Sequence, residues 1–249
     1  MKLSKKFKSP NYNVRKSKKI KFIIIHYTAL KNYKKAISHL CNVKNKVSSH
    51  YLISQSGKIY NLVDDKMRAW HAGQAYWKKS IDMNSQSIGI ELDYSKNIHN
   101  NKFSENMIES LLLLLNKLKK KYKIKDHNIL GHSDIAPFRK IDPGPDFPWK
   151  RIYNYDFSLN SFEGKRIKIT DLKFWFKKNN INSSREIALF ILSFIGYDTS
   201  KVIKNKKLIK VIISAYQAHY LQYNYTGVVD RPTLGHLYKH LFNNLLTKV

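Results

Sequence analysis

The chain has 249 residues, 43% of them hydrophobic, so it can bury a substantial core as one large domain or two smaller ones. It carries 46 Lys and Arg against 17 Asp and Glu, and this formal net charge of +29 favours polyanionic partners. Lys, Asn and Ile are all abundant, so compositional drift explains the charge equally well, and basicity alone identifies no partner. The single cysteine, Cys41, excludes an internal disulfide and a four-thiolate zinc site.

Residues 1–150 are predicted to alternate between strands and helices. Residues 20–27 form a short, β-branched apolar run, typical of a strand buried on both faces. Ser104 is placed to cap a long helix over 104–122 with one apolar face. The other expected elements are a helix over 33–40 and strands over 49–54, 58–63, 87–93 and 129–131. Together they predict an α/β domain with a central mixed sheet flanked by helices.

The composition of the chain changes towards the end of this domain. Residues 131–149 are rich in proline and glycine, so we expect a long functional loop without regular structure there. Residues 151–164 have the character of a linker. We therefore expect the first domain to end at residue 150 and a second domain to begin at residue 165.

Residues 165–249 have a helical pattern. Ser183 and Glu186 have the spacing of a capping box, and Gly196 stands where a C-cap would end that helix. Two further helices are expected over 208–221 and 232–245. The prediction is a small three-helix domain with no catalytic motif.

Among the ten histidines, two follow buried strands. His26 lies at the carboxyl end of the strand over 20–27, where α/β sheets collect their ligands, and His132 follows the strand over 129–131. Asp142 comes ten residues later, across the proline-rich loop. Two imidazoles and a carboxylate are a common ligand set for catalytic zinc, which keeps its fourth position for water. The alternative for His26 is a hydrogen-bonded core histidine.

Two further polar residues stand out near this set. Strand alternation turns Glu91 away from its apolar neighbours in the strand over 87–93, and a carboxylate in a core strand is costly unless it has a partner or a task. Lys140 shares a side with Asp142 if the chain is extended there, while Arg139 and Ile141 face away. The alternatives are a salt-bridged structural glutamate and an ordinary surface lysine.

At these residues the chain resembles a known family, the zinc N-acetylmuramoyl-L-alanine amidases of the amidase-2 type. The resemblance is strongest to the AmiD-like branch, which adds a C-terminal peptidoglycan-binding domain. Its blocks follow in order over residues 20–150, at Ile25–Ala29, Ser48–Ile53, Arg68–Gly73, Asn84–Leu92 and Gly131–Pro145. A looser resemblance to the small peptidoglycan-binding domain covers Val211–Gln217 and Gly227–Asp230.

The resemblance implies a role for each residue of the site. His26, His132 and Asp142 would hold one Zn²⁺ per chain. Some relatives carry cysteine at the third of these positions, where this chain has Asp142. Glu91 would be the catalytic acid and base, and Lys140 would stabilise the oxyanion. The substrate groove would be lined by Thr28, Ala29 and His71, whereas His50 is expected to be structural.

The implied partner is peptidoglycan or its muropeptide fragments, and we expect no nucleic acid, no transmembrane span and a monomer. Location in the cell envelope is favoured, although no export signal is visible near the N-terminus. Two alternatives stay open. One is a cytoplasmic amidase that recycles anhydro-muropeptides. The other is a non-catalytic peptidoglycan-recognition protein, which would typically lack a zinc ligand.

Overall fold

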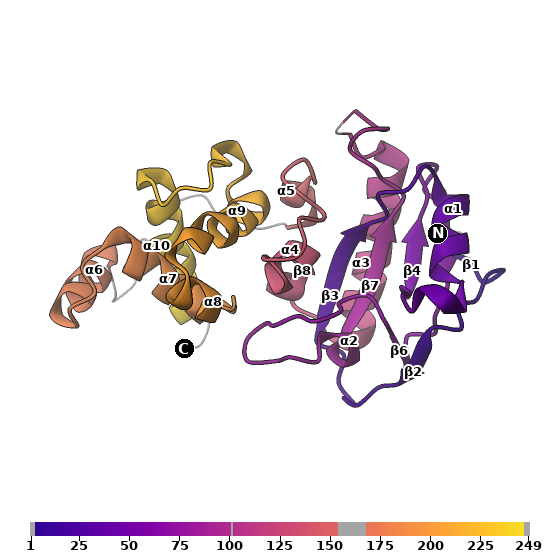
Figure 1. The fold of residues 1–249 in the computed structure, drawn as a ribbon, viewed down its shortest axis with the longest axis horizontal. Helices are drawn as coiled ribbons and strands as arrows, with labels where there is room; N and C mark the ends of the chain where they lie inside the picture. Colours follow the sequence, from indigo (N-terminus) through magenta and orange to yellow (C-terminus); the bar gives the residue numbers. More distant parts are fainter. Residues whose placement is uncertain (1–2, 101, 154–167, 247–249) are drawn as a thin grey trace.

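The computed structural model describes all residues except 1–2, 101, 154–167 and 247–249. An N-terminal α/β part and a C-terminal helical part lie against each other, with two short helices between them (Figure 1). Most of the predicted linker, residues 154–164, lies outside the described residues. Residues 151 and 152 belong to a short helix instead.

A six-stranded mixed sheet forms the centre of the N-terminal part, in the order β1-β5-β4-β7-β3-β8. Three of its strands, β3, β7 and β8, run parallel to one another, and β4 and β5 pair antiparallel. The bounds are β1 Leu3–Ser4, β3 Phe22–Tyr27, β4 Tyr51–Ile53, β5 Ile59–Asn61, β7 Ser87–Leu92 and β8 Ile129–Gly131. A separate two-stranded sheet pairs β2 (Tyr12–Val14) with β6 (Met67–Ala69). The prediction of a central mixed sheet flanked by helices is confirmed.

The helices of this part cover both faces of the sheet. Helix α3 (Glu105–Tyr122) is capped by Ser104, as predicted, and its apolar side packs on Ile23, Ile25 and their neighbours. Helix α1 (Tyr33–Leu40) covers β4 and β5 on the other face. The remaining helices are α2 Met83–Gln86, α4 His132–Ile135 and α5 Trp149–Ile152, with 3₁₀ turns at Val43–Asn45 and Asp126–Asn128. The expectation that 131–149 lacks regular structure is wrong, because α4 and the start of α5 lie there.

The C-terminal part contains five α-helices among its described residues. Three match the predicted helices, namely α7 (Ser184–Ile195), α9 (Ile209–Tyr220) and α10 (Arg231–Leu246). The expected capping box of Ser183 and Glu186 begins α7. The sequence pattern missed α6 (Ile169–Lys178) and α8 (Ser200–Lys204). Further 3₁₀ turns are Lys206–Leu208 and Gln222–Asn224.

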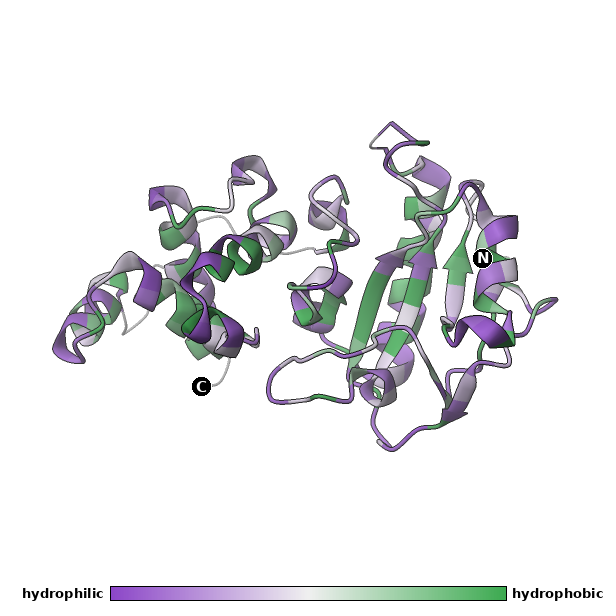
Figure 2. Cartoon of the chain, in the orientation of Figure 1, coloured by the Kyte–Doolittle hydropathy of each residue, from purple (hydrophilic) through white to green (hydrophobic). Residues whose placement is uncertain are grey.

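The two parts share one continuous hydrophobic core. Strand β3 contributes Phe22 and Ile24, which cluster with Trp77 and with the apolar faces of α7, α9 and α10. Figure 2 shows β3 as a strongly hydrophobic strand, as expected for a strand with packed layers on both sides. The helical part therefore closes the sheet face beside β3 and β8, while α1 closes it beside β4. The middle of that face is left for the site.

Candidate active site

The candidate residues converge at the carboxyl ends of the central parallel strands. His26, near the end of β3, is in register with Glu91 on β7, so both side chains lie on the same face of the sheet. His132 follows β8 directly as the first residue of α4. The Ser133 N–H donates to the carbonyl of Asp142 at 2.9 Å, which brings the loop back beside His132.

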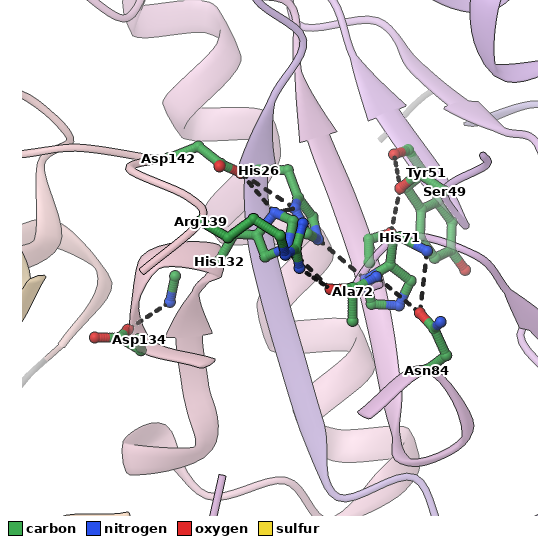
Figure 3. Close-up of polar contacts among 12 residues, drawn as sticks. His26, Ser49, Tyr51, His71, Ala72, Asn84, His132, Asp134, Arg139 and Asp142 are labelled. Atoms are coloured by element: carbon green, nitrogen blue, oxygen red, sulfur yellow. Dashed lines mark hydrogen bonds and ion pairs between the residues drawn. The ribbon is translucent and has the colours of Figure 1, made fainter. Parts of the chain in front are cut away.

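His26, His132 and Asp142 form a buried group able to hold a metal ion (Figure 3). The two Nδ1 atoms are 3.0 Å apart, and each is 3.2 Å from Asp142 Oδ2. Tetrahedral zinc with bonds of about 2.0–2.1 Å separates its ligands by about 3.3 Å, so these donor atoms fit such an ion. Among the described residues these are the three that qualify as such a group, which leaves the fourth position open.

The protonation states of this group suit a cation. Burial and, after it, the neighbouring His132 lower the pKa of His26 to about 4, so the imidazole is neutral at pH 7. Burial alone would raise the pKa of Asp142, but hydrogen bonds and charge interactions with His132 and His26 hold it well below its usual range. Neutral imidazole and ionised carboxylate are the forms that bind metals.

A layer of polar contacts behind the three donors fixes their orientation. His132 Nε2 lies 3.1 Å from the Ala72 carbonyl, and His26 Nε2 lies 3.0 Å from His71 Nδ1. Each outer nitrogen is thus engaged away from the donor group, which leaves Nδ1 as the ligating atom. Arg139 donates to the carbonyls of Ala72 and Gln74. The expectation that Arg139 faces away is therefore wrong, because its guanidinium folds back to the chain behind His132.

His71 is buried behind His26 rather than at an open surface. Its Nδ1 faces His26, and its Nε2 lies 3.3 Å from Ser87 Oγ. A β-carbon on Gly89 would come within 2.4 Å of the His71 ring, so the glycine in β7 is what admits the imidazole. The Asn84 side chain accepts from the His71 N–H and holds this segment in place. Contact between His71 and substrate stays a prediction.

A small cavity of about 170 Å³ opens in front of the donor group. Glu91 and Lys140 line it, together with Thr28 and His71, whereas Ala29 adopts a left-handed φ of 53° just beyond Thr28. Burial and, after it, the charge of Asp142 raise the pKa of Glu91 to about 8 against the opposing charge of Lys140. Glu91 Oε2 has no hydrogen-bond partner among the described residues. A carboxyl group without a structural partner, next to open space, is available for proton transfer.

His50 lies one layer further from the cavity. It is fully buried, and its Nδ1 accepts the Gly89 N–H at 3.0 Å. Its Nε2 lies 2.7 Å from the Arg15 guanidinium. These contacts connect β7 to the N-terminal segment and agree with a structural role.

The sequence pattern gave no indication of Asp134, which supports the site from the other side. Its fully buried carboxylate accepts the Gly131 N–H at 2.7 Å and so fixes the first turn of α4, which begins at His132. Tyr197 and His219, both from the helical part, complete its hydrogen bonds. The spacing of Gly131 and Asp134 matches that of a capping box, and this is the one signal in the sequence that could have revealed it.

Three donors with an open fourth position, next to an unpaired carboxyl group, are the arrangement expected of a metal-dependent hydrolase. Comparison with known proteins gives the family. The family model described as N-acetylmuramoyl-L-alanine amidase matches residues 16–145, which include every residue of the candidate site. The chain belongs to this family of enzymes, as the sequence motifs predicted.

Individual relatives extend the match beyond the catalytic part. The amidase AmiD of Escherichia coli is 31% identical over 230 residues, which are 86% of this chain and 80% of AmiD. The 1,6-anhydro-N-acetylmuramyl-L-alanine amidase AmpD of Haemophilus influenzae is 42% identical over 107 residues, 43% of this chain and 56% of AmpD.

Two solved structures share the whole architecture. AmpDh3 of Pseudomonas aeruginosa superposes with a TM-score of 0.72 and 27% identity, covering 90% of this chain and 92% of that one. E. coli AmiD, in complex with anhydro-N-acetylmuramic acid-L-Ala-D-gamma-Glu-L-Lys, gives a TM-score of 0.68 and 27% identity, covering 98% and 92%. The helical part thus belongs to the shared fold. No described helix is long and apolar enough to cross a membrane.

Proposed function

We propose that this chain hydrolyses the amide bond between N-acetylmuramic acid and L-alanine of peptidoglycan, using one zinc ion held by His26, His132 and Asp142. The observation that carries the proposal is the convergence of these three donors in front of a free Glu91 carboxyl group. E. coli AmiD and P. aeruginosa AmpDh3 have each been solved in complex with an anhydro-muramyl peptide, which supports the same class of substrate here.

The residues of the chain have separate tasks in this reaction. A zinc ion at this site would lower the pKa of a water molecule and so supply the nucleophile. Glu91 takes the proton of the attacking water and later delivers it to the leaving nitrogen of L-alanine. Lys140, on the same cavity wall, stabilises the negative charge that develops on the carbonyl oxygen. Thr28, Ala29 and His71 are proposed to contact the substrate around this centre.

The test separates the two carboxylates. A Glu91→Ala variant should keep its zinc and lose turnover by roughly 10²–10⁴-fold, the usual contribution of a positioned acid and base. An Asp142→Ala variant should lose both zinc and activity, because three protein ligands are the usual minimum for catalytic zinc. Metal content and rate are measured together on both purified proteins. Loss of zinc from Glu91→Ala would make Glu91 a ligand, and near-normal turnover would place the proton carrier elsewhere.

We further propose that residues 165–249 bind peptidoglycan and place the enzyme in the cell envelope. A cluster of exposed aromatic side chains supports this. Trp175 on α6 is 44% exposed, and its ring centroid lies 5.5 Å from that of the exposed Phe190 on α7. Soluble fragments would need no such anchor, which argues against a cytoplasmic recycling enzyme. Parallel digestion of intact sacculi and purified anhydro-muropeptides, with products identified by mass, tests this choice.

A further inference from the structure

A second groove lies at the opposite end of the sheet from the cavity. The catalytic residues lie at the carboxyl ends of β3, β7 and β8, whereas this groove is formed where the chain enters β3 and β8. A strand of six residues such as β3 is roughly 20 Å long, and this length separates the two sites. The turn after Trp77 and the end of α3 complete it. Its volume is about 1160 Å³, against about 170 Å³ for the catalytic cavity.

The lining of this groove is strongly basic. Eight of its sixteen lining residues are lysines, all of them exposed, and none is acidic. They are Lys18, Lys19, Lys21, Lys78, Lys79, Lys121, Lys123 and Lys125. Lys121 forms an ion pair with Asp65, which lies outside the lining. Like charges gathered in a concave surface raise the local potential and attract anions.

Structural requirements explain only part of this cluster. Lys121 and Lys123 lie at the carboxyl end of α3, where positive charge complements the helix dipole. The lysines at 18–21 and 78–79 belong to other segments and have no such reason to be basic. Lys78 and Lys79 also form a two-residue hairpin turn with φ values of 47° and 67°, a conformation that normally selects Asn-Gly. Both lysines of this turn are exposed and line the groove.

The dimensions and lining of the groove indicate the kind of anion. Its volume exceeds the range of about 300–1000 Å³ typical of small-molecule sites, which favours an extended chain over a single ion. Lysines without arginine act as point charges and suit phosphate groups that need no bidentate recognition. Nucleic-acid bases require exposed aromatic faces, but Phe22 and Trp77 are buried here and Tyr122 is half-buried beneath Lys121.

We propose that this groove binds a linear polyanion that carries repeated phosphate groups and no bases. A polyol-phosphate chain and inorganic polyphosphate share this chemistry. The proposal does not depend on the amidase reaction, because the groove and the catalytic cavity lie at opposite ends of the strands. Binding there would hold the enzyme on a phosphate-bearing polymer while the catalytic face stays open.

The test compares two triple variants of the full chain with equal loss of charge. One replaces Lys19, Lys79 and Lys125 of the groove with glutamine, and the other replaces three exposed lysines elsewhere, Lys5, Lys44 and Lys66. Affinity for inorganic polyphosphate and for poly(glycerol phosphate) is measured across a salt series. The groove variant should bind roughly tenfold more weakly, and its log–log salt slope should fall by about two, since each phosphate contact contributes about 0.7.

The outcomes distinguish the sources and the alternatives. The control variant should bind almost like the wild type, and both variants should hydrolyse a soluble muropeptide at the wild-type rate. Preference for one of the two polymers identifies the source within the proposed chemistry. Equal weakening in both variants would overturn the proposal in favour of diffuse surface charge, as would failure of the wild type to bind either polymer. Tighter, groove-dependent binding of single-stranded DNA would overturn the exclusion of bases.

Discussion

Replacing Tyr197 with phenylalanine removes one hydroxyl group from a buried carboxylate. Asp134 is fully buried, and it accepts hydrogen bonds from the Gly131 N–H, the Tyr197 hydroxyl and His219 Nδ1. When the buried Asp134 carboxylate loses this donor, no water can replace it. The uncompensated cost of desolvation therefore lowers the free energy of unfolding. For a hydrogen bond to a charged group, we expect a loss of about 1.5–3 kcal/mol.

Thermal unfolding measures this loss against a matched control. For a chain of this length, 1 kcal/mol corresponds to about 2–4 °C, so the Tm of Tyr197→Phe should fall by about 3–12 °C. Tyr216→Phe is the control, because Tyr216 is equally buried and its hydroxyl contacts His236 rather than a carboxylate. A neutral hydrogen bond contributes about 1 kcal/mol, so the control should lose less.

The metal site provides the second readout. Asp134 accepts the Gly131 N–H and so fixes the start of α4, where His132 lies. Because Tyr197→Phe leaves the Asp134 side chain less firmly held, this variant should bind zinc several-fold more weakly. Tyr216→Phe does not affect Asp134 and should bind zinc like the wild type. Competition with a chromogenic chelator measures both affinities. The reasoning is refuted if the two variants lose the same stability and both bind zinc like the wild type.

Two further predictions concern residues whose roles are proposed. Replacing His71 with alanine should lower zinc affinity by roughly 10–100-fold, the usual effect of removing a hydrogen-bond partner of a metal ligand; unchanged affinity with a raised KM would instead support contact with substrate. Replacing Trp175 with alanine should reduce cosedimentation with sacculi and spare turnover of a soluble muropeptide, whereas alanine at the separate and even more exposed Tyr223 should change neither. Equal losses in both variants would refute a localised wall-binding surface.

The catalytic residues could be predicted from sequence because local rules place them. A β-branched strand that ends in His26 puts that side chain at the carboxyl edge of a sheet, and strand alternation puts Glu91 on one definite face. The structure brings both residues together across one pair of strands in register. A proline-rich loop brings Asp142 back beside His132. Hydrophobic periodicity could not predict this contact, and the family motif indicated it instead.

The elements that the sequence pattern missed are short or depend on distant contacts. Strand β1 has two residues and β2 and β6 three each, too few to show a period. Helix α4 is a single turn within the proline-rich segment, and Asp134, which fixes it, has partners 63 and 85 residues away in sequence. Such contacts leave no local trace, which is also why Arg139 was expected to face away.

The predicted boundary at residue 150 separates the motifs of the chain but not its packing. Helix α4 begins with the zinc-ligand candidate His132, and two residues later Asp134 accepts hydrogen bonds from α9 and from the turn after α7. Trp149 stacks on His219 with ring centroids 3.6 Å apart, and Gly196 leaves no room for a β-carbon against Trp77. A helical region held only by a linker would need none of these contacts. The region proposed to bind the wall therefore also supports the helix that carries one of the three metal ligands, so wall binding and catalysis share a structural element.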